Sequence, residues 1–109
     1  AMPTYTVEQN HEQASALLKA MSNPHRLLVL CHLARGEKCV GELESIVGLS
    51  QSALSQHLAR LRHDGVVKTR RDAQTIFYSL RGDEAMTILE ALAGLFEMPA
   101  VVEKARIAV

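Results

Sequence analysis

A chain of 109 residues with a formal net charge of zero is expected to fold as a single domain. Apolar residues make up 48% of it but aromatic residues only 4%, so aliphatic side chains must build the core. We expect a soluble cytoplasmic protein with no membrane partner, because no apolar run approaches the roughly 18 residues of a membrane span and no leader is recognisable. Two cysteines and five histidines without ligand spacing predict no disulfide framework, no metal and no other cofactor.

Three helices are predicted in the first half of the chain. Residues 1–6 are interpreted as a tag remnant and an extension, because Ala1 stands before Met2. Apolar residues recur at helical spacing over residues 7–21. Asn23-Pro24 then signals the start of a second helix, which ends at Gly36. The third helix covers residues 40–47, and Gly48 permits the turn after it.

The second half predicts another helix, a hairpin and a last helix. Ser50 caps a helix that continues to Asp64 and places Leu54, Leu58 and Leu61 on one buried side. Branched and aromatic residues predict strands at 66–71 and 75–80. The last helix spans residues 83–98, is closed by Pro99 and leaves residues 99–109 as a tail. The predicted fold is mainly α with a β-hairpin, four helices preceding the hairpin and one following it, in a domain of residues 7–98.

The helices at 40–47 and 50–64 have helix-turn-helix proportions. Outward Gln, Ser and Arg side chains on the second of them suit the edges of bases in the major groove. The predicted base-reading residues are Gln51, Ser52, Ser55, Gln56 and Arg60. An ordinary solvated helix is the alternative, and the caps, the glycine stop and the basic hairpin together argue against it.

The hairpin after this helix is basic although the whole chain is neutral. Basic side chains of this kind add affinity for the phosphate backbone without sequence information. The predicted backbone contacts are His57, Lys68, Arg70, Arg71 and Gln74. His57 lies at the edge of the buried seam, so it either contacts a phosphate or packs against the helix. A charged hairpin tip that only aids solubility is the alternative for the hairpin.

A family resemblance is carried by LSQSALSQHLARLR followed by TRRDAQTIFYSL. This combination resembles the ArsR/SmtB family of winged helix-turn-helix repressors, in particular its NolR, HlyU and BigR/SqrR branch, and the likeness covers residues 14–98. It implies a homodimer that binds an imperfect inverted repeat in double-stranded promoter DNA and excludes polymerase. It also implies that Ser52, Ser55, Gln56 and His57 face the DNA and that residues 70–74 form the wing.

The last helix is apolar on more than one face and therefore needs burial on two sides. The apolar first helix is its natural partner in a dimer. The predicted interface residues are Leu17, Leu18, Ile88, Leu89, Leu92, Leu95 and Phe96. Two-fold symmetry would place the recognition helices about one DNA turn apart, roughly 34–36 Å.

The sensor layouts that the resemblance implies are incomplete in this chain. Gly41 replaces the second cysteine of the metal box that would include Cys39, and the last helix has no histidine for a zinc site. Cys31 matches one cysteine of the sulfur-sensing branch, but Glu97 and Met98 stand where its partner would fall. The sequence therefore predicts a repressor without a complete metal or dithiol sensor.

Other functions remain open at this point. Cys31 and Cys39 are candidate thiol sensors, and a repressor responding to reactive sulfur or an oxidant is the first alternative, with the small-molecule or sulfur effector left open. A non-specific nucleoid-associated protein is the second. A thiol-redox enzyme has no CxxC, cofactor loop or acid–base constellation to support it, so no enzyme activity is predicted.

Overall fold

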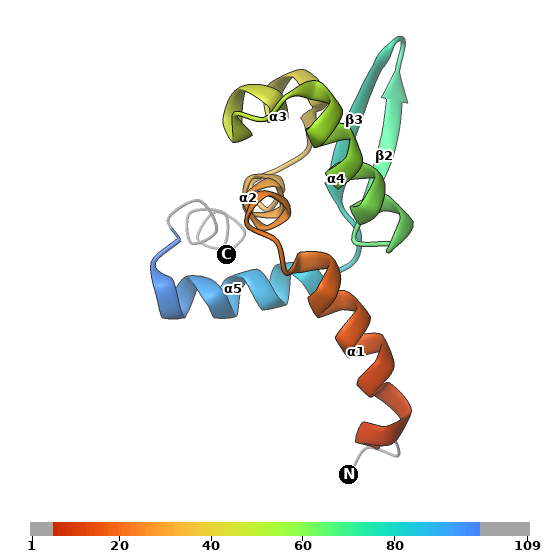
Figure 1. Cartoon of the computed structure of the whole chain (residues 1–109), viewed down its shortest axis with the longest axis vertical. Helices are drawn as coiled ribbons and strands as arrows, with labels where there is room; N and C mark the ends of the chain where they lie inside the picture. The colour runs from red at the N-terminus through yellow and green to blue at the C-terminus, as the bar shows by residue number, and fades with distance from the viewer. Residues whose placement is uncertain (1–5, 99–109) are drawn as a thin grey trace.

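The computed structural model describes residues 6–98 and confirms the predicted fold class (Figure 1). The predicted tail, and residues 1–5 of the predicted extension, lie outside the described residues. The elements in chain order are α1 (Val7–Met21), α2 (Pro24–Leu33), β1 (Lys38–Cys39), α3 (Val40–Val47), α4 (Gln51–His63), β2 (Val67–Asp72), β3 (Thr75–Leu80) and α5 (Glu84–Phe96). The structure is thus mainly helical with one small sheet.

Local side-chain signals set the helix starts. The side chain of Asn23 accepts hydrogen bonds from the backbone N–H groups of His25 and Arg26, at 2.9 and 3.1 Å. Ser50 does the same for Ala53, at 3.2 Å. These bonds satisfy N–H groups that have no partner inside their own helix. Because these signals are short-range, the predicted starts of the second and fourth helices agree with α2 and α4. The predicted bounds of α1 and α3 also agree with the structure to the residue.

Four helix bounds differ from the predicted ones. α4 ends at His63 rather than Asp64, because Asp64 is its C-cap. The second helix ends at Leu33, because Gly36 is the last residue of a turn, with φ +141°, rather than the cap itself. α5 begins one residue later than predicted and ends at Phe96, where Glu97 takes a left-handed conformation. Met98, the last described residue, still packs against the core.

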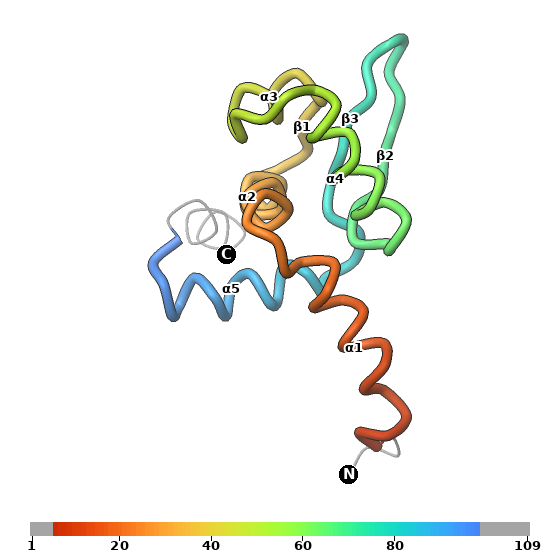
Figure 2. Tube along the Cα trace, viewed as in Figure 1, coloured from red at the N-terminus to blue at the C-terminus, as the bar shows by residue number. Residues whose placement is uncertain are grey.

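The sheet has three antiparallel strands in the order β1-β3-β2, as Figure 2 shows. The two-residue strand β1 was not predicted, because it is defined only by pairing of Lys38 with Tyr78 and of Cys39 with Phe77. β2 is shifted by one residue from its predicted range, since Asp72 pairs with Thr75 and leaves a two-residue turn.

The core is aliphatic, as the composition predicts. Leu54, Leu58 and Leu61 of α4 are at most 2% exposed, which confirms the predicted seam. The other large side chains that are fully enclosed come from the second and third helices, the hairpin and the last helix: Val29, Leu30, Leu43, Val67 and Leu89. At about 1.5–3 kcal/mol for each fully buried side chain of this size, this cluster supplies the main force holding α4 against the body.

The elements divide between two ends of the molecule (Figure 1). α3, α4 and the tip of the β2–β3 hairpin occupy one end, whereas α5 and the N-terminal half of α1 lie at the other. Arg26 sets the junction of α1 and α2: its Nε donates to the carbonyl of Ala20 at 2.6 Å and its Nη2 to that of Lys19 at 3.2 Å. No helix within residues 6–98 is long and apolar enough to cross a membrane.

Candidate DNA-binding interface

The α3–α4 pair forms a helix-turn-helix. Gly48 ends α3 with φ +69°, a conformation that glycine adopts with little strain, and Ser50 caps α4 two residues later. Because the leucine seam faces the body, the opposite side of α4 faces outward for at least its first two turns. An exposed helix of this kind has the dimensions to enter a major groove.

Four of the predicted base-reading residues lie on this outward surface. Gln51, Ser52, Ser55 and Gln56 are all exposed, and none of their side chains has a hydrogen-bond partner among residues 6–98. The arrangement leaves amide and hydroxyl groups free at the start of a helix, where both can meet base edges. We call this set the outer face of α4.

The fifth predicted base-reading residue has an internal partner. The Nε of Arg60 donates to Oδ2 of Asp64 at 2.6 Å, one turn further along the helix. This hydrogen bond, with a weaker one from His63, keeps the pKa of Asp64 below its usual value. The ion pair is exposed at the arginine, so it leaves Arg60 at the surface near the C-terminal end of α4.

His57 is packed against another element. Its ring is half-buried, with the centroid 5.7 Å from that of His25 in the first turn of α2 and a 38° angle between the planes. Burial lowers the pKa of His57, and the positive charges of Arg26 and His25 lower it further. The histidine therefore joins α4 to α2 while part of it stays accessible.

The two arginines of the wing point in opposite directions. Successive residues of a strand alternate between faces, and residues paired across strands share a face. Arg71 lies opposite Ile76, on the sheet face that also carries Tyr78 and borders α4. Arg70 lies opposite Phe77 on the other face of the sheet, which we call the outer face of the sheet. Lys68 is also on the outer face, opposite Ser79, and Gln74 is exposed in the turn.

A groove separates α4 from the sheet. It has a volume of about 450 Å³ and receives side chains from α3, α4 and β3. The lining residues are Val40, Ser55, Leu58, Ala59, Arg62, His63 and Tyr78. Arg62 was not among the predicted contacts, although its helical position, about 80° from Leu54 and about 20° from Ser55, could have indicated it. A groove with Arg62 and a tyrosine at the edge of the outer face suits a DNA backbone.

The cysteines occupy different environments, and both are free thiols. Cys31 is buried, and burial raises the pKa of its thiol, which disfavours the reactive thiolate. Cys39 is half-buried at the N-cap of α3, where its N–H donates to Glu42 at 3.0 Å and so lowers the pKa of that carboxyl. Among the described residues, no three His, Cys, Asp or Glu side chains are grouped to hold a metal ion.

The residues predicted for the dimer interface form three groups, which are exposed, half-buried and fully enclosed. Leu95 and Phe96 are 73% and 71% exposed at the end of α5, and Leu18 is 54% exposed on α1. Leu17, Ile88 and Leu92 are half-buried. Leu89 is fully enclosed by the chain's own core, so it supports α5 from within and presents no surface.

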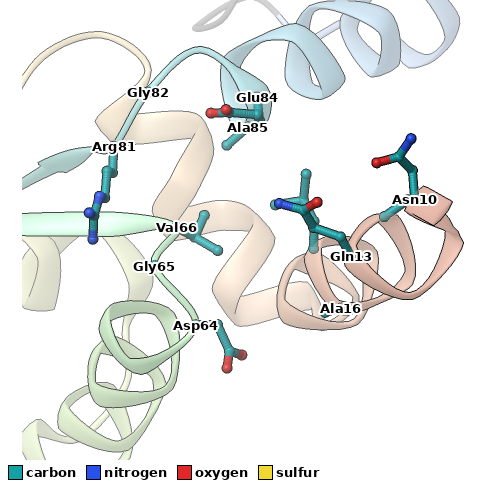
Figure 3. Close-up of a pocket in the computed structure, with 12 residues that line it drawn as sticks. Asn10, Gln13, Ala16, Asp64, Gly65, Val66, Arg81, Gly82, Glu84 and Ala85 are labelled. Carbon is teal, nitrogen blue, oxygen red and sulfur yellow. The ribbon is translucent and has the colours of Figure 1, made fainter. Parts of the chain in front are cut away.

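A second hollow lies at the α1 end of the molecule (Figure 3). It is bounded by α1, by the turn that joins α4 to β2, and by the segment that joins β3 to α5. Its lining includes the apolar Leu17, Val66 and Ala85 and polar side chains such as Gln13 and Arg81. The hollow lies apart from the outer face of α4 and borders the exposed surface of α1.

These features define a class of protein. A helix-turn-helix followed by a basic hairpin is the winged helix-turn-helix, a fold that binds DNA. The family model described as "Bacterial regulatory protein, arsR family" matches residues 23–69. That range runs from the cap of α2 to the middle of β2 and includes the whole helix-turn-helix.

Known proteins are similar to this chain over most of its length. The transcriptional activator HlyU of Vibrio cholerae is 53% identical over 90 residues, which cover 83% of each protein. The nodulation protein NolR of Rhizobium meliloti is 51% identical over 98 residues, covering 88% of this chain and 80% of NolR. The crystal structure of the transcriptional repressor BigR from Xylella fastidiosa superposes with a TM-score of 0.80 at 41% identity, covering 87% and 97% of the two chains.

The chain belongs to the arsR family of DNA-binding transcriptional regulators. This confirms the family resemblance that the sequence carries. Among the matched relatives, HlyU is named a transcriptional activator and BigR a transcriptional repressor.

Proposed function

We propose that the protein is a homodimeric, sequence-specific repressor that binds an inverted-repeat operator. In this proposal α4 enters the major groove and reads bases, while the β2–β3 wing and His57 contact the backbone. A dimer seated on a promoter represses transcription by excluding polymerase. HlyU is named an activator and BigR a repressor, so the direction of regulation is part of the proposal.

One observation carries the proposal: the outer face of α4 offers several polar side chains that make no hydrogen bond to any other residue within 6–98. These exposed side chains have no partner among the described residues. Gln side chains can therefore pair with adenine, and Ser hydroxyls can pair with either hydrogen-bond donors or acceptors on the base edges. Below them the helix is fixed by three enclosed leucines, so these groups are held in a defined geometry. Arg62 and Arg71 flank this face and would supply phosphate contacts on its wing side.

The dimer is supported by the apolar surface at the other end. Ile88, Leu92 and Leu95 follow the spacing i, i+4, i+7, so they form one stripe along α5, with Phe96 at its end. A second copy is the natural cover for such a stripe in a protein whose target is an inverted repeat. Leu17 and Leu18 on α1 would extend the same interface.

We further propose that the repressor works without a metal or dithiol sensor. The burial of Cys31 argues against it as a rapidly reacting thiol. The alternative that retains support is a thiol response through Cys39, because this residue is partly accessible and caps the first helix of the helix-turn-helix. A modification there would act directly on the position of α3.

The test is the affinity of the protein for an operator obtained by selection in vitro, measured by fluorescence anisotropy against a scrambled duplex. We expect the operator to bind at least about a thousandfold more tightly, as specific sites do. Equal affinity would identify a non-specific nucleoid-associated protein. The same titration after treatment with polysulfide, peroxide, zinc or arsenite tests the sensor: a large loss of affinity that the Cys39→Ser variant does not show would establish the thiol response.

A further inference from the structure

Two adjacent arginines of β2 have different surroundings. Arg71 is exposed on the sheet face that borders the groove beside α4, and no partner for its side chain is found among the described residues. Arg70 faces the other way and is engaged on two sides. Although the pair Arg70-Arg71 suggests one basic tip, the alternation of the strand separates the two charges.

The contacts of Arg70 are bidentate and long-range in sequence. Its Nε lies 3.2 and 3.1 Å from the two carboxylate oxygens of Glu37, and its Nη2 donates to the same carboxylate. Its guanidinium carbon lies 4.5 Å from the centre of the Phe77 ring. Parallel donation to a carboxylate combined with stacking on an aromatic ring suits the planar guanidinium and fixes its orientation. These hydrogen bonds lower the pKa of Glu37, so the carboxylate stays charged.

This ion pair connects parts of the DNA-binding end that are far apart in the chain. Glu37 lies immediately before β1, and β1 leads directly into α3. Arg70 lies on β2, at the far side of the central strand β3. Cys39, Phe77 and Arg70 are successive partners across the three strands, so they form one row on the outer face of the sheet. The Glu37–Arg70 pair lies across the central strand β3. It therefore connects the segment that leads into α3, the first helix of the helix-turn-helix, to the wing.

We propose that Glu37 and Arg70 are positioning residues that hold the wing in a fixed position relative to the helix-turn-helix, and that Arg71, not Arg70, contacts the DNA phosphates. This inference rests on the proposed function. To reach a phosphate, Arg70 would have to leave both a bidentate carboxylate and an aromatic ring. The acidic partner then has an unexpected role, since it supports binding to a polyanion.

The sign of one substitution separates this proposal from simple electrostatics. If Glu37 only masked a phosphate-binding arginine, Glu37→Gln would tighten DNA binding and make its salt dependence steeper by about two phosphate contacts, one from each protomer of the dimer. If the pair positions the wing, Glu37→Gln weakens operator binding by about two- to fivefold, the range expected for an exposed ion pair. In that case the slope of log K against log salt stays as in the wild type.

The experiment measures operator affinity and salt slope for Glu37→Gln, Arg70→Gln, Arg71→Gln and the double variant with both members of the pair replaced. We expect Arg71→Gln alone to reduce the slope by about two, one for each protomer of the dimer, and the double variant to be no weaker than either single variant of the pair. The charge reversal Glu37→Arg with Arg70→Glu restores affinity to within about twofold of wild type, because it re-forms the pair. Glu90→Gln, an exposed glutamate on α5, is the matched control for loss of one acidic charge.

Hydrogen exchange without DNA gives an independent readout. The β2 amides exchange faster in Glu37→Gln and Arg70→Gln than in the wild type, and the charge-reversed pair slows them again. A lower salt slope in Arg70→Gln, tighter binding by Glu37→Gln, or unchanged exchange in both would overturn the proposal. If the wild type does not distinguish operator from scrambled duplex, the proposed function fails, whereas the exchange data and the slopes on any duplex still decide the role of the pair.

Discussion

α4 and α5 are helices of the same length, 13 residues each, with opposite surfaces. Both bury a leucine in the same core, yet α4 exposes amide and hydroxyl groups whereas α5 exposes Leu95 and Phe96. The buried side of each helix thus fixes its position in the fold, and the exposed side determines which kind of partner it can bind. A polar outer face at one end and an apolar one at the other are suited to DNA and to a second protein copy.

The largest effect is expected from a change that makes the exposed apolar surface of α5 charged. Replacing Leu95 and Phe96 together with Glu should leave the protomer folded, because both side chains are more than two-thirds exposed. We expect a monomer by sedimentation, with operator affinity about 100-fold lower because the two half-sites no longer bind as one unit. Thr87→Glu, on the polar side of α5, is the control. A dimer that persists in the double variant would contradict the proposed interface.

The outer face of α4 is tested by shortening one side chain. Gln56→Ala should remove about 1–3 kcal/mol of discrimination at one base position, because a bidentate amide contact carries that much. The measurement is anisotropy on a set of operators with single base changes, in which the variant should lose preference at one position of each half-site and keep it elsewhere. Arg62→Gln is the comparison, since removing a phosphate-binding side chain from the groove should weaken binding to all duplexes alike. Uniform weakening by Gln56→Ala would exclude base reading by this residue.

A smaller effect is expected from pH at the edge of α4. The pKa of His57 is lowered in the fold by burial and then by the charges of Arg26 and His25, so the unfolded chain binds the proton more readily. The free energy of unfolding should therefore fall as the pH drops through the ordinary histidine range, near 6.5. His32, whose pKa is also lowered, contributes in the same window. His57→Gln should flatten the dependence in chemical denaturation from about pH 7.5 to about pH 5.5, and an unchanged slope would show that His57 is not responsible.

Short-range signals explain how much of the fold the sequence could predict. Asn23-Pro24, Ser50 and Gly48 each act within a few residues, so the helix-turn-helix was predicted almost to the residue. The strand β1 could not be predicted, because two residues become a strand only through pairing with β3, which lies nearly 40 positions away.

In the candidate site, too, features set by local sequence could be predicted, whereas features set by distant residues could not. The outer face of α4 follows from helical periodicity alone, because its residues alternate with the enclosed leucines at helical spacing. The partner of Arg70 is 33 positions distant and that of His57 is 32, so a set of basic residues read from the sequence could not tell an occupied charge from a free one. Apolar periodicity likewise did not distinguish Leu89, which is enclosed, from Leu95, which is not.

The first turn of α2 gives the division between the two ends a mechanical meaning. Two consecutive residues there point to different helices: Arg26 holds the last carbonyls of α1, and His25 lies against His57 of α4. In a dimer built on α1 and α5, this turn would connect the helices at the two-fold axis to the recognition helix α4. A rotation of α4 relative to α1 by a few degrees at this turn would change the distance between the two copies of α4. It would thus change the length of DNA that the two recognition helices can span.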